Sequence, residues 1–217
     1  MPIGVGDRPD SAGSRDPGGP PVVGVLALQG AFDLHRRRLE SLGAVAPLVR
    51  QPIDLDGLDG VILPGGESTT MSRLLTTSGL FDELQGRLDD GLPVLGTCAG
   101  MVMLASRISG MDQQSLGAMD IEVRRNAFGR QVDSFESALD IPVLGQPPYH
   151  AVSIRAPVIE SVGDGVEILA RLPDGAPVAA RQNNLVAAAF HPELTPDLRF
   201  HKYFLSFVDR KLEAKAA

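Results

Sequence analysis

A single cysteine lies in a segment that could position a nucleophile. Residues 93–100 read PVLGTCAG, so a short apolar stretch leads into Cys98 between two glycines, and a second apolar stretch follows. Such a strand–turn–helix context is typical of a nucleophile elbow, in which glycines let the backbone turn sharply. The adjacent helix N-terminus favours a thiolate, and the amide of Ala99 could hold an oxyanion. The alternative is a buried cysteine in a turn of small residues.

A histidine and a carboxylate that could serve this thiolate lie in a second segment. His191 follows the apolar run 185–190, so it should emerge at the carboxyl end of a strand, where open α/β sheets place ligand sites. Pro192 keeps the chain extended, and residues i and i+2 of an extended chain point the same way. Glu193 can therefore orient one imidazole nitrogen while the other faces Cys98. The alternative is a surface histidine beside a solvated glutamate.

The other three histidines have no comparable neighbours in the sequence. His35 belongs to the basic run HRRR, for which we expect solvent or a partner surface. His150 lies in a Pro-rich loop and His201 in the C-terminal helix. We therefore expect none of the three in the catalytic site.

A third segment, 63–71 (LPGGESTTM), also follows a predicted strand and opens a helix. Adjacent glycines let a backbone N–H approach a ligand closely, so Gly66 is a candidate second oxyanion donor. It is not a Walker loop, because no Gly-Lys-Ser/Thr follows. A plain helix N-terminus capped by Ser68 is the alternative.

These segments require a fold that brings strand ends together. Apolar runs typical of strands buried on both faces alternate with helical patterns in the first half of the chain, which predicts a mostly parallel sheet. The expected strands are 22–28, 44–49, 60–63 and 93–96, and the expected helices are 31–42, 68–75, 80–88 and 99–108. Further strands are expected at 121–123, 152–154, 166–172, 177–181 and 185–190, with a last helix from 195. We predict one three-layer α/β domain over 22–217 with a mostly parallel, mixed sheet.

Composition narrows the class of protein. The chain has 217 residues, a net charge of −7 and a pI near 5.1, which argues against a nucleic-acid-binding face. No apolar run of about 18 residues exists, so no membrane span is expected. Residues 1–21 are rich in Gly, Pro and Asp without an apolar centre, so we expect a disordered leader and not a secretory signal. One cysteine excludes an internal disulfide and suits a cytoplasmic location.

With these segments assembled, the chain resembles the class I (triad) glutamine amidotransferases, and within them the glutaminase subunits of pyridoxal 5′-phosphate synthase. The resemblance runs from about Val22 to the C-terminal helix. GTCAG and HPE mark the class in general, whereas the other motifs are specific to the vitamin B6 branch. The motifs, in the order of the family, are GVLALQGAF (24–32), LPGGESTTM (63–71), GTCAGM (96–101), RRNAFGRQVDSFE (124–136), SIRAP (153–157) and FHPELT (190–195).

The resemblance implies a flavodoxin-like α/β fold and a mechanism. The Cys98 thiolate attacks the carboxamide of L-glutamine, the amides of Gly66 and Ala99 hold the oxyanion, and His191 protonates the departing ammonia. A zwitterionic substrate needs an anion for its ammonium and a cation for its carboxylate, which suits the implied set. The implied glutamine-binding positions are Gly66, Glu67, Ser68, Arg125, Ile154 and Arg155.

The resemblance also implies a partner. In this family ammonia passes to a (β/α)₈-barrel synthase subunit in a large hetero-oligomer, and docking orders the oxyanion region, where Gln29 is implicated. Pyridoxal 5′-phosphate is then the product of the complex, so we expect neither a cofactor nor a metal in this chain. Ser153 departs from the family pattern, because a larger, often aromatic residue is expected there.

Two other interpretations remain. One is an amidotransferase subunit that feeds an imidazole- or nucleotide-forming synthase, which the 124–136 motif disfavours. The second is a non-catalytic module on the same fold, which would be expected to have lost Cys98, His191 or Glu193.

Overall fold

The computed structural model describes residues 19–125 and 134–216. Most of the predicted leader, residues 1–21, lies outside these ranges, as does most of the 124–136 motif.

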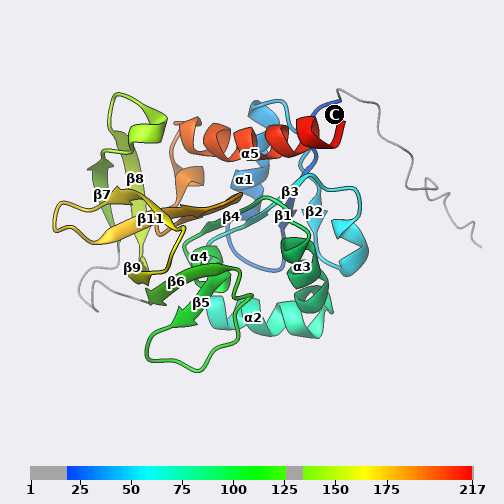
Figure 1. Cartoon of the computed structure of the whole chain (residues 1–217), viewed down its shortest axis with the longest axis horizontal. Helices are drawn as coiled ribbons and strands as arrows, with labels where there is room; N and C mark the ends of the chain where they lie inside the picture. The colour runs from blue at the N-terminus through cyan, green and yellow to red at the C-terminus, as the bar shows by residue number, and fades with distance from the viewer. Residues whose placement is uncertain (1–18, 126–133, 217) are drawn as a thin grey trace, which may run out of the picture.

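A seven-stranded sheet forms the centre of the molecule (Figure 1), in the order β10-β11-β12-β4-β3-β1-β2. Five neighbouring strands are parallel, and β11 runs antiparallel to both of its neighbours, β10 and β12, which confirms the predicted mixed sheet. The parallel strands that bear the apolar runs are buried on both faces, as expected. Their bounds are β1 Val23–Leu26, β2 Leu48–Val49, β3 Gly60–Leu63, β4 Val94–Thr97, β10 Glu167–Arg171, β11 Pro177–Gln182 and β12 Leu185–Ala188.

Helices cover both faces of this sheet. Figure 1 shows α1 and α5 on one side and α2, α3 and α4 on the other, which gives the three predicted layers. The α-helices are α1 Phe32–Ser41, α2 Ser68–Thr77, α3 Leu80–Asp89, α4 Ala99–Leu104 and α5 Arg199–Ala216, and the short 3₁₀ turns are η1 Pro52–Leu55, η2 Pro142–Leu144 and η3 Pro192–Leu194.

Two small sheets lie beside the central one. Strands β5 (Ala105–Ile108), β6 (Met119–Arg124) and β9 (Val158–Val162) form the first, and β7 (Ser134–Leu139) pairs with β8 (Tyr149–Ile154) in the second.

Two predicted helix boundaries were wrong. The helix expected over 99–108 ends at Leu104, because the next four residues pair with β6 as strand β5. The last helix begins at Arg199 and not at 195, because residues 195–198 form bends and a turn after η3. Asp197 then accepts a hydrogen bond from the Arg199 amide (3.0 Å) and stabilises the start of α5.

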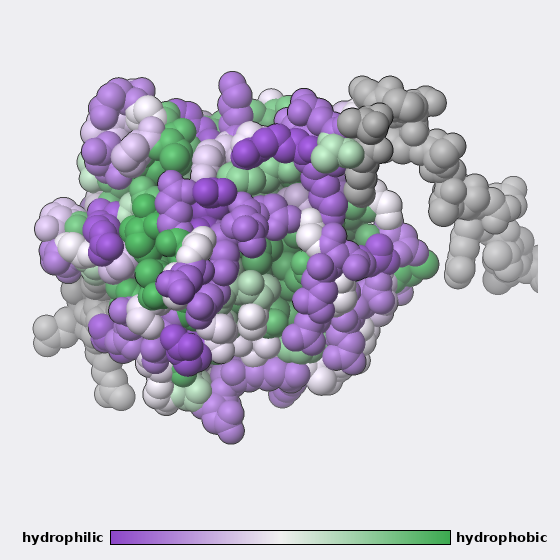
Figure 2. All heavy atoms as spheres, viewed as in Figure 1, coloured by the Kyte–Doolittle hydropathy of each residue, from purple (hydrophilic) through white to green (hydrophobic). Residues whose placement is uncertain are grey.

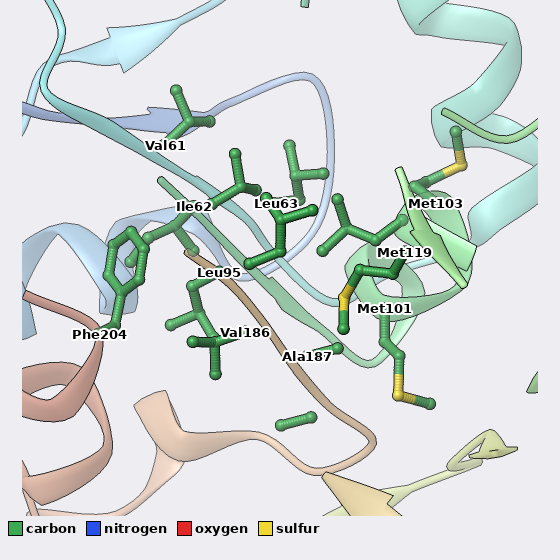
Figure 3. Close-up of a cluster of buried hydrophobic side chains, with 14 of the residues drawn as sticks. Val61, Ile62, Leu63, Leu95, Met101, Met103, Met119, Val186, Ala187 and Phe204 are labelled. Atoms are coloured by element: carbon green, nitrogen blue, oxygen red, sulfur yellow. The ribbon is translucent and has the colours of Figure 1, made fainter. Parts of the chain in front are cut away.

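The core holds the strand ends in place from both sides of the sheet. Phe204 of α5 packs on one face, while methionines of α4 and β6 fill the other (Figure 3). Each of these side chains is fully buried, so the strands at the centre have little freedom to shift. The residues labelled in the cluster are Val61, Ile62, Leu63, Leu95, Met101, Met103, Met119, Val186, Ala187 and Phe204.

The face drawn in Figure 2 is mainly hydrophilic, with hydrophobic atoms visible in smaller patches between polar side chains. None of the helices within the described residues has the length and apolar character needed to cross a membrane. Across the same residues, no group of three or more His, Cys, Asp or Glu side chains is arranged to hold a metal ion.

Candidate active site

The three predicted functional segments meet at one edge of the central sheet. Strands β3, β4 and β12 are parallel neighbours, so their carboxyl ends lie together. Gly66, Cys98 and His191 each follow one of these strands and line a common cavity. Topology therefore explains why residues more than 90 positions apart along the chain can act together.

Cys98 occupies a strained turn between β4 and α4. Its φ is +49°, a conformation that non-glycine residues rarely adopt outside functional sites. The flanking glycines, predicted to permit the turn, have another role because neither has a positive φ. A Cβ at Gly100 would lie 2.0 Å from the Leu63 carbonyl oxygen, and one at Gly96 would lie 2.6 Å from the Gly100 oxygen. They allow α4 to approach the sheet closely.

His191 and Glu193 form the predicted pair. The imidazole Nδ1 lies 2.7 Å from Glu193 Oε1, and the carboxylate is fully buried. Burial alone would lower the pKa of His191, but hydrogen bonds to Cys98 and Glu193 and the charges of both raise it to about 10. Burial likewise would raise the pKa of Glu193, but His35 and His191 lower it well below its ordinary value. At neutral pH the site therefore contains an imidazolium next to an ionised carboxylate.

Gly65 lies against both the histidine and the cysteine. A Cβ built at this position would meet His191 Cε1 at 2.4 Å and Cys98 Cβ at 3.3 Å. The absence of a side chain at Gly65 is thus a condition for the present position of the imidazole ring.

The cavity in front of Cys98 has a volume of about 160 Å³. It contains every residue predicted to bind glutamine, together with two apolar residues, Val102 and Pro157, that were not predicted. Val102 lies four residues after Cys98, one turn along α4, so this spacing in the sequence could have predicted that both side chains face the cavity. The lining residues are Gly66, Glu67, Ser68, Cys98, Ala99, Val102, Arg125, Ile154, Arg155, Pro157 and His191.

Two of the predicted substrate-binding charges contact each other. Arg125 donates to Glu67 in an ion pair. Partial burial would raise the pKa of Glu67, but the neighbouring guanidinium lowers it overall. Glu67 and not Ser68 caps α2, by accepting from the Thr69 amide, while the Ser68 hydroxyl donates to Gln113 (3.0 Å). The cavity thus presents one carboxylate, Glu67, and two guanidinium groups, Arg125 and Arg155, to a zwitterion.

Gln29 does not line the cavity but holds one of its walls. Its side-chain amide donates to the Glu67 carbonyl and accepts from the Glu67 amide, both at 3.1 Å. Gly66 is next to this clamp with φ +152°, and a Cβ there would lie 2.6 Å from the Gln29 side chain. Gln29, which the resemblance links to the oxyanion region, therefore contacts the Gly66 segment directly.

The end of β8 and the residue after it present backbone to the cavity. The Cys98 sulfur lies 3.8 Å from the Ile154 carbonyl oxygen, and Arg155 has a positive φ of +42°. Ser153 is buried and does not line the cavity. The Ser153 side chain, which departs from the family pattern, therefore does not face the substrate cavity.

The prediction that His35 is a surface residue was wrong. His35 is fully buried, and its Nε2 lies 3.2 Å from Glu193 Oε2. His35 and Leu39, four residues apart, form the buried face of α1, whereas the arginines that follow His35 gave the segment its basic character. His201 is also fully buried, 3.0 Å from His35, whereas His150 is on the surface beside Glu136.

Comparisons with known proteins identify the family of this chain. A sequence model of the SNO glutamine amidotransferase family matches residues 25–210. The pyridoxal 5′-phosphate synthase subunit PdxT of Clavibacter sepedonicus is 55% identical over 191 residues, which are 87% of this chain and 91% of that protein. The subunit of the same name from Pelotomaculum thermopropionicum is 57% identical over 183 residues, 84% of this chain and 93% of that one.

Solved structures share the fold. A crystal structure of a glutamine amidotransferase, 49% identical, superposes with a TM-score of 0.81 and covers 86% of this chain and 98% of that chain. A structure of PurLQS from Thermotoga maritima contains a chain with a TM-score of 0.63 over 89% of this chain and 99% of that one. At 16% identity it shows likeness of fold alone. The flavodoxin-like fold and the amidohydrolase class predicted from the sequence are confirmed, and the chain belongs to the SNO glutamine amidotransferase family.

Proposed function

We propose that this protein hydrolyses L-glutamine to L-glutamate and ammonia with Cys98, His191 and Glu193 as its catalytic triad. The observation that carries the proposal is the His191 imidazole, whose Nδ1 lies 2.7 Å from the buried Glu193 carboxylate and which lines the same cavity as Cys98. Three side chains in these roles are what a nucleophile, a proton carrier and its orienting carboxylate require.

Charge complementarity supports one orientation of the substrate in the cavity. Glu67 binds the α-ammonium of glutamine, and Arg125 or Arg155 binds the α-carboxylate. The ion pair between Arg125 and Glu67 is then replaced by ion pairs with the substrate. The side-chain carboxamide then lies toward Cys98.

The proposed chemistry has two stages, formation of a thioester on Cys98 and its hydrolysis. The Cys98 thiolate attacks the carboxamide carbon, and the carbonyl oxygen becomes an oxyanion that the amides of Gly66 and Ala99 hold. His191 gives its Nε2 proton to the carboxamide nitrogen, and the C–N bond breaks. Ammonia departs, and the γ-glutamyl group remains attached to Cys98 as a thioester. The imidazole, now neutral, takes a proton from water as the water oxygen attacks the thioester. Glutamate leaves, and the thiolate–imidazolium pair is restored.

The ammonia is delivered to a synthase partner. The relatives more than half identical to this chain are named as pyridoxal 5′-phosphate synthase subunits, which supports a synthase partner. The resemblance of the sequence motifs implies that this partner is a (β/α)₈-barrel synthase, in a large hetero-oligomer. Pyridoxal 5′-phosphate is the product of that complex, and this chain works in the cytoplasm without a cofactor or metal of its own.

Ammonia release with and without the synthase partner tests the proposal. We expect glutamine hydrolysis to rise strongly when the partner is added and to be lost in the Cys98→Ala variant. Undiminished ammonia release from that variant would exclude the mechanism. Recovery of an imidazole- or nucleotide-forming synthase in a pull-down, in place of the barrel synthase, would overturn the assignment of the partner.

A further inference from the structure

A cluster of buried polar side chains lies behind the triad, on the side away from the cavity. It consists of His35, Thr97, Glu193 and His201, and each of the four has no exposed surface. They come from α1, β4, η3 and α5, so four elements of the fold converge here. Burial of so many polar groups is unfavourable unless they are paired, which makes their partners informative.

The Glu193 carboxylate lies between two imidazoles. Oε1 is 2.7 Å from Nδ1 of His191, and Oε2 is 3.2 Å from Nε2 of His35. Nε2 of His35 is also 3.1 Å from the Thr97 hydroxyl, so its proton is shared, and the contact to Oε2 is not a well-aligned hydrogen bond. No other donor within the described residues satisfies Oε2. His35 is therefore the group in a position to hold the second oxygen.

His201 determines which nitrogen of His35 carries the proton. The His201 Nε2 lies 3.0 Å from His35 Nδ1, while its own Nδ1 has no hydrogen-bond partner in the described part of the chain. Burial is the main cause that lowers the pKa of His201, to about 3, so this ring is neutral. An orphaned buried N–H is rarer than an under-satisfied acceptor. The His201 proton is accordingly on Nε2 and is donated to His35 Nδ1, which leaves the His35 proton on Nε2.

Helix α1 holds the main chain of the same segment as well. Arg38, one turn after His35, donates from Nε to the Glu193 carbonyl oxygen (3.2 Å). Helix α1 thus contacts both the backbone and the carboxylate of Glu193. Hydrophobic packing of α1 against the sheet would not by itself require these two polar contacts.

We propose that His35 is a positioning residue for the glutaminase triad, whose Nε2–H holds Glu193 Oε2 while His201 fixes its tautomer. With His191 at Oε1 and His35 beside Oε2, rotation of the carboxylate is restricted, so the Nδ1–H of His191 keeps its direction and Nε2 of that ring stays aimed at Cys98. His35 does not touch the substrate cavity. The inference rests on the proposed triad, to which it adds a residue that acts through Glu193.

The test compares His35→Gln with His35→Asn in the complex with the synthase partner. A Gln side chain reaches far enough to place an N–H near Glu193, whereas Asn is too short and retains only a polar group near His201. We expect the Asn variant to lose about 10- to 100-fold in kcat with little change in KM for glutamine, as when a partner that orients a working histidine is removed. The Gln variant should recover most of the loss.

His150→Asn is the matched control, because His150 is an exposed histidine that pairs only with the exposed Glu136 among the described residues. It should retain wild-type kcat and KM. Equal kcat in the two His35 variants, or a loss that follows the free energy of unfolding in both, would overturn the proposal. If the His35→Asn variant does not fold, His201→Asn tests the same tautomer, with a lower kcat and unchanged KM expected and an unchanged kcat contradicting it.

The same assay distinguishes failure of this inference from failure of the triad. If Cys98→Ala still releases ammonia, the proposed function itself fails. If Cys98→Ala is inactive and the His35 variants match the wild type, the triad stands and only the positioning role is excluded.

Discussion

Replacing Gly65 by alanine should disable the site without disturbing the fold. The added Cβ would lie 2.4 Å from His191 Cε1, whereas ordinary contacts begin at 3.4 Å. Because Cys98 Cβ is 3.3 Å away on another side, the imidazole must retreat by about 1 Å, a misplacement that can lower the rate about 100-fold. We expect kcat to fall by about this factor, with a smaller change in KM, because Gly65 itself does not line the cavity.

The assay is ammonia release in the presence of the synthase partner, with unfolding followed by circular dichroism. Gly86→Ala is the matched control, because Gly86 lies within α3 and a Cβ there meets nothing within 4 Å. It should keep full activity and gain about 0.5–1 kcal/mol of stability. Full activity of the Gly65→Ala variant would refute the claim that the catalytic histidine must stay where the structure places it.

Three further variants probe separate parts of the account. Glu193→Gln should lower the pKa of His191 from about 10, so the alkaline limb of the kcat/KM profile moves to lower pH, because activity is lost as the pH rises through that pKa; an unmoved limb would contradict this. Arg125→Gln should weaken glutamine binding by roughly 1.5–3 kcal/mol, measured by calorimetry, and unchanged affinity would remove Arg125 from the substrate site. Gly100→Ala should destabilise the fold by about 1–3 kcal/mol or more in denaturant unfolding, because its Cβ would lie 2.0 Å from the Leu63 oxygen. Wild-type stability would show that α4 tolerates a larger separation.

The proposed triad could be placed from the sequence because Cys98 and His191 each follow an apolar run at a recognisable strand end. Cys98 and His191 could be placed on neighbouring strands from pattern alone, since carboxyl ends of parallel strands meet at one edge. The short distance between Glu193 and His191 followed from the extended backbone that Pro192 imposes. Local rules were sufficient where the chemistry lies within a few residues of one strand.

Residues whose role depends on contacts between distant elements were not predictable in this way. The basic neighbours of His35 indicated a surface position, although its spacing of four from Leu39 marks the buried face of α1. The segment Ala105–Ile108 continued a helical pattern, but pairing with β6 made it a strand. The close approach of Gly65 to His191 depends on two loops whose separation no sequence pattern fixes.

Acid quenching during turnover, followed by mass spectrometry of the digested chain, tests the central claim most directly. With glutamine and the synthase partner present, we expect a glutamyl group attached through a thioester to the peptide that contains Cys98, the one cysteine of the chain. A glutamyl group on any other residue during turnover, with Cys98 unmodified, would contradict the account.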